Sequence, residues 1–304
     1  MEMNESKKVD YFTCRFSLYK EEQIHINDIL NPQTKEEVFN TFILKLKKEI
    51  RLELPVDQKQ FIMYYFGTIT EKRYLFKFAK KVERTLNHPS FSDIELTKVE
   101  DYPWCSIIVD VERQIFFINK NSQITSNVIT LKNYIAKAIS NQLKEFQVSL
   151  QLEVMTNTNS FWESVAQNIG EIQYVELTLI SPNFLGQSYS TTKMLKEFKG
   201  EFNNDSVVLK FINNRGNLKI SPKSHFLKDI LAYIANGCGN WRMKLETQRS
   251  PVTSEDQAIT YPLDADIFTL TASQKEDIQI AFAHLDALER ANHKKGDIDD
   301  DWSN

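Results

Sequence analysis

Hydrophobic residues alternate with polar ones in several short stretches of the chain, and this two-residue period predicts β-strands. Residues 11–19 are the first such stretch. Two later pairs of stretches are joined only by Glu71-Lys72 and by Glu112-Arg113, which is short enough for antiparallel hairpins. Further strands are predicted over residues 60–70, 73–79, 93–99, 104–111, 114–119 and 148–154.

Apolar residues recur at three- and four-residue spacing in two other segments of this half, and that spacing predicts helices. The first helix covers residues 35–51, with Thr34 placed to cap its start and Pro55 beyond its end. The second covers residues 128–146 and has one apolar face.

From residue 172 onward the predicted elements follow the order β-α-β-β-α-β. This is the order of the split βαβ, ferredoxin-like arrangement. We therefore predict an α+β protein with antiparallel sheets and packed helices, whose C-terminal half is ferredoxin-like. The strands of this half are predicted over residues 172–180, 207–212, 218–220 and 241–246, and its helices over 161–169, 192–198 and 223–235.

With 304 residues, the chain is long enough for two packed units and an additional segment. We predict an N-terminal α+β domain over residues 1–156 and a ferredoxin-like domain over residues 157–250. Residues 251–304 are predicted to be an acidic extension with one helix, over 278–291, and a disordered end from residue 294.

Charge is divided unevenly along the chain. Residues 1–250 hold 33 Lys and Arg against 29 Asp and Glu, whereas residues 251–304 hold 4 against 12. The net charge of −4 therefore combines a mildly basic body with an acidic tail. This division fits a body that binds nucleic acid and a tail that competes with phosphate for the same cations.

Several classes of protein lack support in the sequence. The three cysteines are far apart, which favours reduced thiols in the cytoplasm over a disulfide framework. No signal-peptide pattern begins the chain and no run of eighteen apolar residues occurs, so we expect a cytoplasmic protein. Zinc-ligand pairs and the common nucleotide-binding and nucleophile motifs are absent from the sequence, so no catalytic residue, metal site or cofactor is predicted.

The densest cationic stretch of the sequence lies between residues 72 and 84. Its cations would contact phosphates, and its tyrosine would stack on a base. A hairpin with a buried aromatic face and a basic, solvent-exposed face explains the same pattern, and this alternative stays open. The candidate residues of this first cationic set are Lys72, Arg73, Tyr74, Lys77, Lys80, Lys81 and Arg84.

A second cationic set begins with three lysines at three-residue spacing, which places them on roughly one side of a helix. Lysines act as point charges toward phosphates and do not read bases. A helix face that is merely solvated would look the same in the sequence. The members of this second set are Lys193, Lys196, Lys199, Lys210, Arg215, Lys219 and Lys223.

Acidic residues in predicted strands suggest a metal-dependent nuclease as an alternative, with Asp93, Glu95 and Asp110 as ligands. The familiar nuclease pattern places a lysine two residues after the second acid. Here Lys98 comes three residues after Glu95, on the opposite face of a strand, which weighs against this chemistry. A module that pairs its strands or its Phe-rich surface with another protein is the remaining alternative.

A succession of short signatures extends from about residue 101 to residue 247. It comprises Tyr102-Pro103-Trp104 before the strand Ile107-Ile108-Val109-Asp110, the strand Ile115-Phe116-Phe117-Ile118, an amphipathic helix, Phe161-Trp162 at a helix start, a strand over 175–180 closing on Ser181-Pro182-Asn183, and a strand over 207–212 with an Asn-Arg-Gly turn.

This succession resembles the RexA phage-exclusion proteins of lambdoid phages and a wider group of proteins from bacterial defence loci. The resemblance covers roughly half of the chain. It implies a cytoplasmic homodimer that binds DNA with little sequence preference and takes part in sensing phage infection, with a membrane effector encoded nearby. The family has no catalytic residue to carry over.

Charge division and resemblance together favour a non-enzymatic nucleic-acid-binding sensor or regulator in antiphage defence. It would bind the phosphate backbone through the two cationic sets with little sequence preference, and the acidic tail would weaken non-specific binding. The nuclease and the protein-interaction module remain the alternatives.

Overall fold

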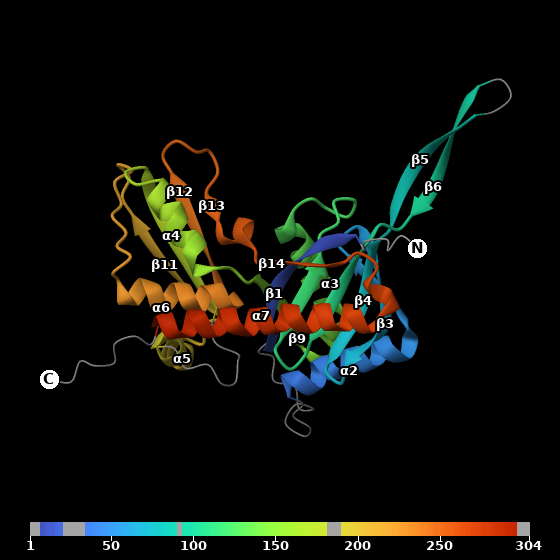
Figure 1. The fold of residues 1–304 in the computed structure, drawn as a ribbon, viewed down its shortest axis with the longest axis horizontal. Coiled ribbons are helices and arrows are strands. Elements are labelled where there is room, and N and C mark those ends of the chain that lie inside the picture. The colour runs from blue at the N-terminus through green and yellow to red at the C-terminus, as the bar shows by residue number, and fades with distance from the viewer. Residues whose placement is uncertain (1–6, 21–33, 90–92, 181–189, 297–304) are drawn as a thin grey trace. The chain divides into compact units, whose positions relative to one another are not determined.

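The computed structural model describes residues 7–20, 34–89, 93–180 and 190–296. The chain forms two compact units (Figure 1). Unit 1 contains residues 1–17, 152–265 and 270–304, and unit 2 contains residues 18–151 and 266–269. The sequence predicted consecutive domains with boundaries at residues 156 and 250. In the structure, each unit combines segments that are distant in sequence.

Unit 2 is built on an antiparallel sheet whose strands follow the order β8-β7-β4-β3-β2. Leu75 and Phe76 are neighbours in β4 and both are buried, so the centre of this sheet is covered on both faces. Both predicted hairpins of this half are confirmed. The strands are β2 (Arg51–Val56), β3 (Lys59–Thr70), β4 (Arg73–Lys80), β7 (Trp104–Asp110) and β8 (Ile115–Asn119).

In the described part of unit 2, two helices pack on the strands, as the apolar spacing predicted. Helix α2 (Lys35–Glu49) contacts β2 and β3, and helix α3 (Val128–Leu143) contacts β2. Thr34 caps α2 in a capping box, because its hydroxyl accepts the Glu37 N–H and the Glu37 carboxylate accepts the Thr34 N–H. A 3₁₀ turn, η1 (Lys144–Phe146), follows α3.

Strands β5 (Val82–Pro89) and β6 (Ile94–Asp101) form a separate two-stranded ribbon in unit 2, which we call the arm (Figure 1). Strand β6 was predicted, but β5 was not, because its polar residues and His88-Pro89 show no alternation. Most side chains of the arm are exposed on both of its faces, including Ile94 and Leu96 of β6.

In unit 1, residues near the two ends of the chain pair with each other. Strand β14 (Thr260–Asp264) runs antiparallel to β1 (Lys8–Lys20), with Tyr261 opposite Tyr11. Helix α7 (Ala272–Gly296) buries Phe282 and Leu285 and contacts α6 (His225–Tyr233). The acidic segment is therefore part of a folded unit up to residue 296, three residues into the stretch predicted to be disordered. Residues 297–304 lie outside the described residues.

The second sheet of unit 1 is antiparallel with the order β11-β10-β12-β13. Its buried face supplies Val175, Leu177 and Trp241 to a core that also contains residues of α4, α5 and α6. The elements are α4 (Thr158–Gln167), β10 (Ile172–Ile180), α5 (Ser190–Phe202), β11 (Ser206–Ile212), β12 (Gly239–Leu245), β13 (Val252–Thr253) and the 3₁₀ turn η3 (Ser254–Gln257). Strand β9 (Val148–Val154) begins in unit 2 and ends in unit 1, and the 3₁₀ turn η4 (Ile267–Thr269) belongs to unit 2.

The α+β class with antiparallel sheets is confirmed, but the ferredoxin-like detail is not. Residues 218–220 form no strand, and β11 lies directly beside β10, whereas the split βαβ order places another strand between them. Strand β10 pairs with β11 along one edge and with β12 along the other, so residues 218–220 have no free edge of β10 to join. Within residues 218–220, the Leu218 N–H reaches β10, where it donates to the Ile172 carbonyl at 3.1 Å.

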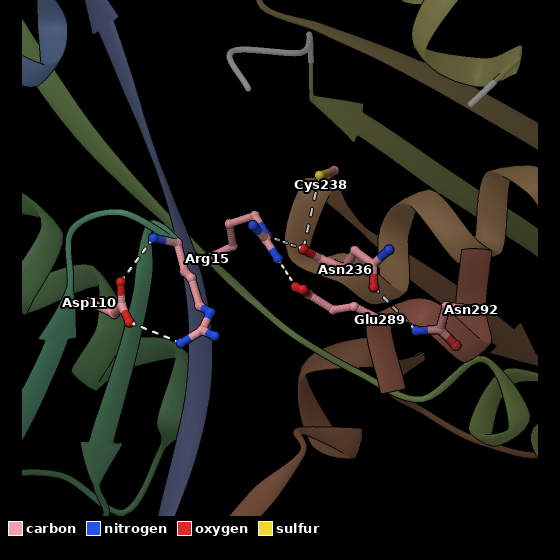
Figure 2. A network of polar contacts seen from close by, with 7 residues as sticks. Arg15, Asp110, Asn236, Cys238, Glu289 and Asn292 are labelled. Atoms are coloured by element: carbon pink, nitrogen blue, oxygen red, sulfur yellow. Dashed lines mark hydrogen bonds and ion pairs between the residues drawn. The ribbon is translucent and has the colours of Figure 1, made fainter. Parts of the chain in front are cut away.

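A buried polar network joins three segments of unit 1. Figure 2 shows Arg15 of β1 reaching Glu289 of α7 and the carbonyl oxygen of Asn236, which accepts the Arg15 Nε–H at 2.6 Å. Asn292 donates to the Asn236 side chain at 3.2 Å. Because an isolated buried charge is costly, this pairing explains how unit 1 accommodates a guanidinium in its interior.

Candidate nucleic-acid interface

The first cationic set does not form a groove of free charges. Three of its members pair with carboxylates: Arg73 with Asp110 at 2.6 Å, Lys81 with Glu100 at 2.5 Å, and Arg84 with Asp101 at 2.5 Å. The first pair is nearly buried, with side-chain exposures of 14% and 4%. It follows from the register of β4 and β7, which places Arg73 opposite Asp110.

Lys77, a further member of this set, is enclosed by aromatic rings. Its Nζ lies 4.7 Å from the ring centroid of Phe66, 4.3 Å from that of Trp104 and 4.1 Å from that of Phe268. Burial lowers the pKa of the Lys77 ammonium, while Asp266 opposes this shift. The cation is stabilised by the ring faces and is not directed at an external phosphate.

The other residues of the first set are dispersed. Lys80 donates to the Ile124 carbonyl at 3.3 Å, and the Tyr74 hydroxyl donates to the Glu71 carbonyl at 3.1 Å. Burial raises the pKa of Tyr74. Lys72 is exposed in the β3–β4 turn and makes no ion pair with any other described residue. The alternative of a structural hairpin therefore accounts for this stretch better than a phosphate-binding groove does.

In the second cationic set, two lysines are paired. Lys199 lies 3.1 Å from Asp205, and Lys210 lies 3.2 Å from Glu176. Lys210 also lies 4.3 Å from the centre of the Tyr174 ring on the neighbouring strand. The charge of both lysines is offset locally, which reduces what they offer to a phosphate.

The remaining five cations of this set are exposed, and none of them makes an ion pair within the described part of the chain. Two of them lie on α5, and three lie on the segment of residues 213–223 that connects β11 to α6. We call this group the basic surface. It consists of Lys193, Lys196, Arg215, Lys219 and Lys223.

Hydrogen bonds fix the elements that carry the basic surface. The backbone N–H and hydroxyl of Thr191 donate to Asp229 at 2.8 and 2.5 Å, which ties the start of α5 to α6. The 213–223 segment is attached to β10 because the Asn213 N–H donates to the Gln173 carbonyl at 2.7 Å. At its far end, Ser224 caps α6 by accepting the Leu227 N–H.

The 213–223 segment also forms one wall of a cavity of about 480 Å³. The opposite wall is α4 and the residues just after it, where Trp162 and Ile169 line the space. Its other lining residues are Val165, Ala166, Gly170, Ile172, Asn217, Leu218, Lys219, Ile220 and Pro222. This cavity leaves no signal in the sequence, because it depends on the packing of two segments that are separated by β10, α5 and β11.

The three acids of the nuclease alternative are not brought together. Asp93 and Glu95 lie at the far end of the arm, whereas Asp110 lies at the end of β7 that is remote from the arm and is held by Arg73 and Arg113. Within residues 7–20, 34–89, 93–180 and 190–296, no group of three or more His, Cys, Asp or Glu is arranged to hold a metal ion.

The three cysteines are buried and form no disulfide in the described residues. Burial raises the pKa of the Cys238 thiol to about 11, so it remains protonated at neutral pH. Its neighbour Gly237 has a φ of 77° at the end of the α6 segment, as a glycine that terminates a helix does.

In the described part of the chain, no helix combines the length and the apolar character that crossing a bilayer requires. Comparison with known protein families finds no family model that matches this chain, and a comparison with curated proteins finds no match.

Proposed function

We propose that this protein binds nucleic acid through the phosphate backbone, with little sequence preference and without catalysing a reaction. The observation that carries the proposal is the basic surface, whose five cations are exposed and lack acidic partners among the described residues. Four of the five are lysines, each of which supplies a point charge, and the fifth, Arg215, supplies a planar guanidinium group with several N–H donors. Contacts of this kind bind phosphates and carry no sequence information.

The biological setting follows from the resemblance to RexA-like proteins. We propose a sensor or regulator of antiphage defence that binds DNA as a homodimer in the cytoplasm and signals to a membrane effector encoded nearby. The acidic tail would weaken non-specific binding. Two of its acids are already engaged within unit 1, because Asp277 pairs with Lys8 and Glu289 pairs with Arg15.

A variant with the five residues of the basic surface changed to Gln tests the proposal. Fluorescence anisotropy with a labelled DNA oligonucleotide is expected to show at least about a tenfold loss of affinity at low salt, because phosphate contacts supply most of non-specific binding. The matched control changes Lys81 and Arg84 to Gln, since both are neutralised by acids. Equal affinities of the wild type and the five-residue variant would contradict the proposal.

A further inference from the structure

The cavity between α4 and the 213–223 segment is suited to a flat, uncharged group. Its volume of about 480 Å³ is within the usual range of ligand pockets, about 300–1,000 Å³. Side chains such as Trp162, Ile169 and Ile220 make its lining mostly apolar, and Asn217 and Lys219 are its polar members. A charged group would lose its hydration against this mostly apolar lining, so a flat apolar surface is the favoured occupant.

An indole forms part of the cavity wall, and the core behind it fixes its orientation. Trp162 is partly buried and meets the Phe161 ring edge to face, with centroids 5.1 Å apart. Phe161 is fully buried and meets Trp241 in the same way at 5.3 Å. A ring that is held in this way offers a rigid surface for stacking at little cost in entropy.

One cation lines the cavity, and two more lie on the same segment of the chain. Lys219 lines it, and Arg215 and Lys223 lie four residues to either side on the same segment. Two acids belong to the same region: Glu171 accepts a hydrogen bond from Thr247 at 2.7 Å, and the Glu246 carboxylate lies close to Gly216. Neither acid pairs with these three cations in the described residues. Three cations along one segment suit a series of phosphates, whereas a molecule with one acid group needs only one of them.

We infer that the cavity takes an unpaired nucleobase of the bound nucleic acid, which stacks on Trp162 while the adjoining phosphates contact Arg215, Lys219 and Lys223. This inference rests on the proposed function and narrows its substrate to single-stranded nucleic acid or strand ends. The lining offers few groups that hydrogen-bond a base edge, so any base can enter, in agreement with little sequence preference.

The test compares labelled oligothymidylate with a blunt duplex of equal length. Ala166 lines the cavity from an exposed position, so Ala166→Phe fills the space without disturbing the core. Its matched control is Gln167→Phe, at the neighbouring exposed position, which does not line the cavity. We expect Ala166→Phe to weaken oligothymidylate binding about tenfold and to leave duplex binding unchanged. Gln167→Phe is expected to change the affinity for neither ligand.

A second readout needs no variant. The fluorescence of 2-aminopurine in the oligonucleotide is expected to change when the base stacks on Trp162 in the wild-type protein. An unchanged oligothymidylate affinity in Ala166→Phe, together with weaker binding by the five-residue Gln variant, would overturn the inference and leave the proposed function in place. Decanoate is the probe for the other kind of occupant, an apolar molecule with one acid group. If Ala166→Phe abolishes decanoate binding and leaves oligonucleotide binding unchanged, the inference is also overturned. If the wild type binds neither nucleic acid, both proposals fail.

Discussion

At the scale of single residues, two glycines of unit 1 differ sharply in their surroundings. Gly239 begins β12, and a Cβ there would lie 2.1 Å from the Thr178 carbonyl oxygen of β10. That oxygen belongs to the backbone of the sheet and cannot move away cheaply. Gly200 lies inside α5 and has no atom within 4 Å of an added Cβ.

Gly239→Ala is therefore expected to lower the free energy of unfolding by more than about 2 kcal/mol, because the β10–β12 pairing must open to admit the methyl group. Gly200→Ala is expected to raise it by about 0.5–1 kcal/mol, through the higher helix propensity of alanine. Urea unfolding followed by tryptophan fluorescence measures both changes. Equal stability of the two variants would contradict this description of the sheet.

Some residue contacts could not be predicted from the sequence. Arg73 and Asp110 were candidates for two different functions, phosphate binding and metal binding. They are partners of each other because β4 pairs with β7, and strand pairing over such a sequence distance is not encoded locally. The cage around Lys77 likewise needs Phe268, which is 191 residues away in the chain (268 − 77).

At the scale of elements, ion pairs connect β6 of the arm to β5 and to Lys81, which directly precedes β5. The hydrogen bonds that Glu100 accepts, first from Lys81 and then from Tyr102, lower the pKa of its carboxyl group. The pKa in the folded chain is thus below the value of about 4.3 in an unfolded chain. The pair contributes to stability above that value, and the contribution is lost as the pH falls through the lower, folded pKa.

Lys81→Gln is expected to raise the pKa of Glu100 toward its ordinary value, and Tyr102→Phe is expected to raise it less. The carboxyl carbon shift of Glu100, followed by NMR between pH 2 and 7, measures both. The control is Lys98→Gln, because Lys98 pairs with Glu83 and not with Glu100. A pKa that is the same in the wild type and Lys81→Gln would show that the arm is not paired in this way.

The elements of strong period were predictable, and the irregular ones were not. The β3–β4 hairpin and helix α2 follow from alternation, short joins and the Thr34 cap. Strand β5 was missed because its side chains are not buried in a core, so its sequence has no alternating apolar pattern. The expected strand over 218–220 did not form, because β11 and β12 pair with the two edges of β10, and these residues line the cavity instead.

At the scale of the whole molecule, the order of segments in sequence differs from their grouping in space. Strand β1 pairs with β14 about 250 residues later, so the acidic segment belongs to unit 1 and is not an appendage. Charge counting along the sequence identified the imbalance but could not show which cations are neutralised. Of the fourteen candidate residues, the five of the basic surface are the exposed cations on unit 1 that lack an acid partner among the described residues.

The salt dependence of DNA binding tests this account most directly. If all five cations of the basic surface contact phosphates of a single strand, the plot of log affinity against log salt has a slope of about −3.5. The variant with all five changed to Gln is expected to show a nearly flat plot. The control variant, with Lys81 and Arg84 changed to Gln, is expected to show the same slope as the wild-type protein. A flat plot for the wild-type protein, or the same slope in the five-residue variant, would contradict the account.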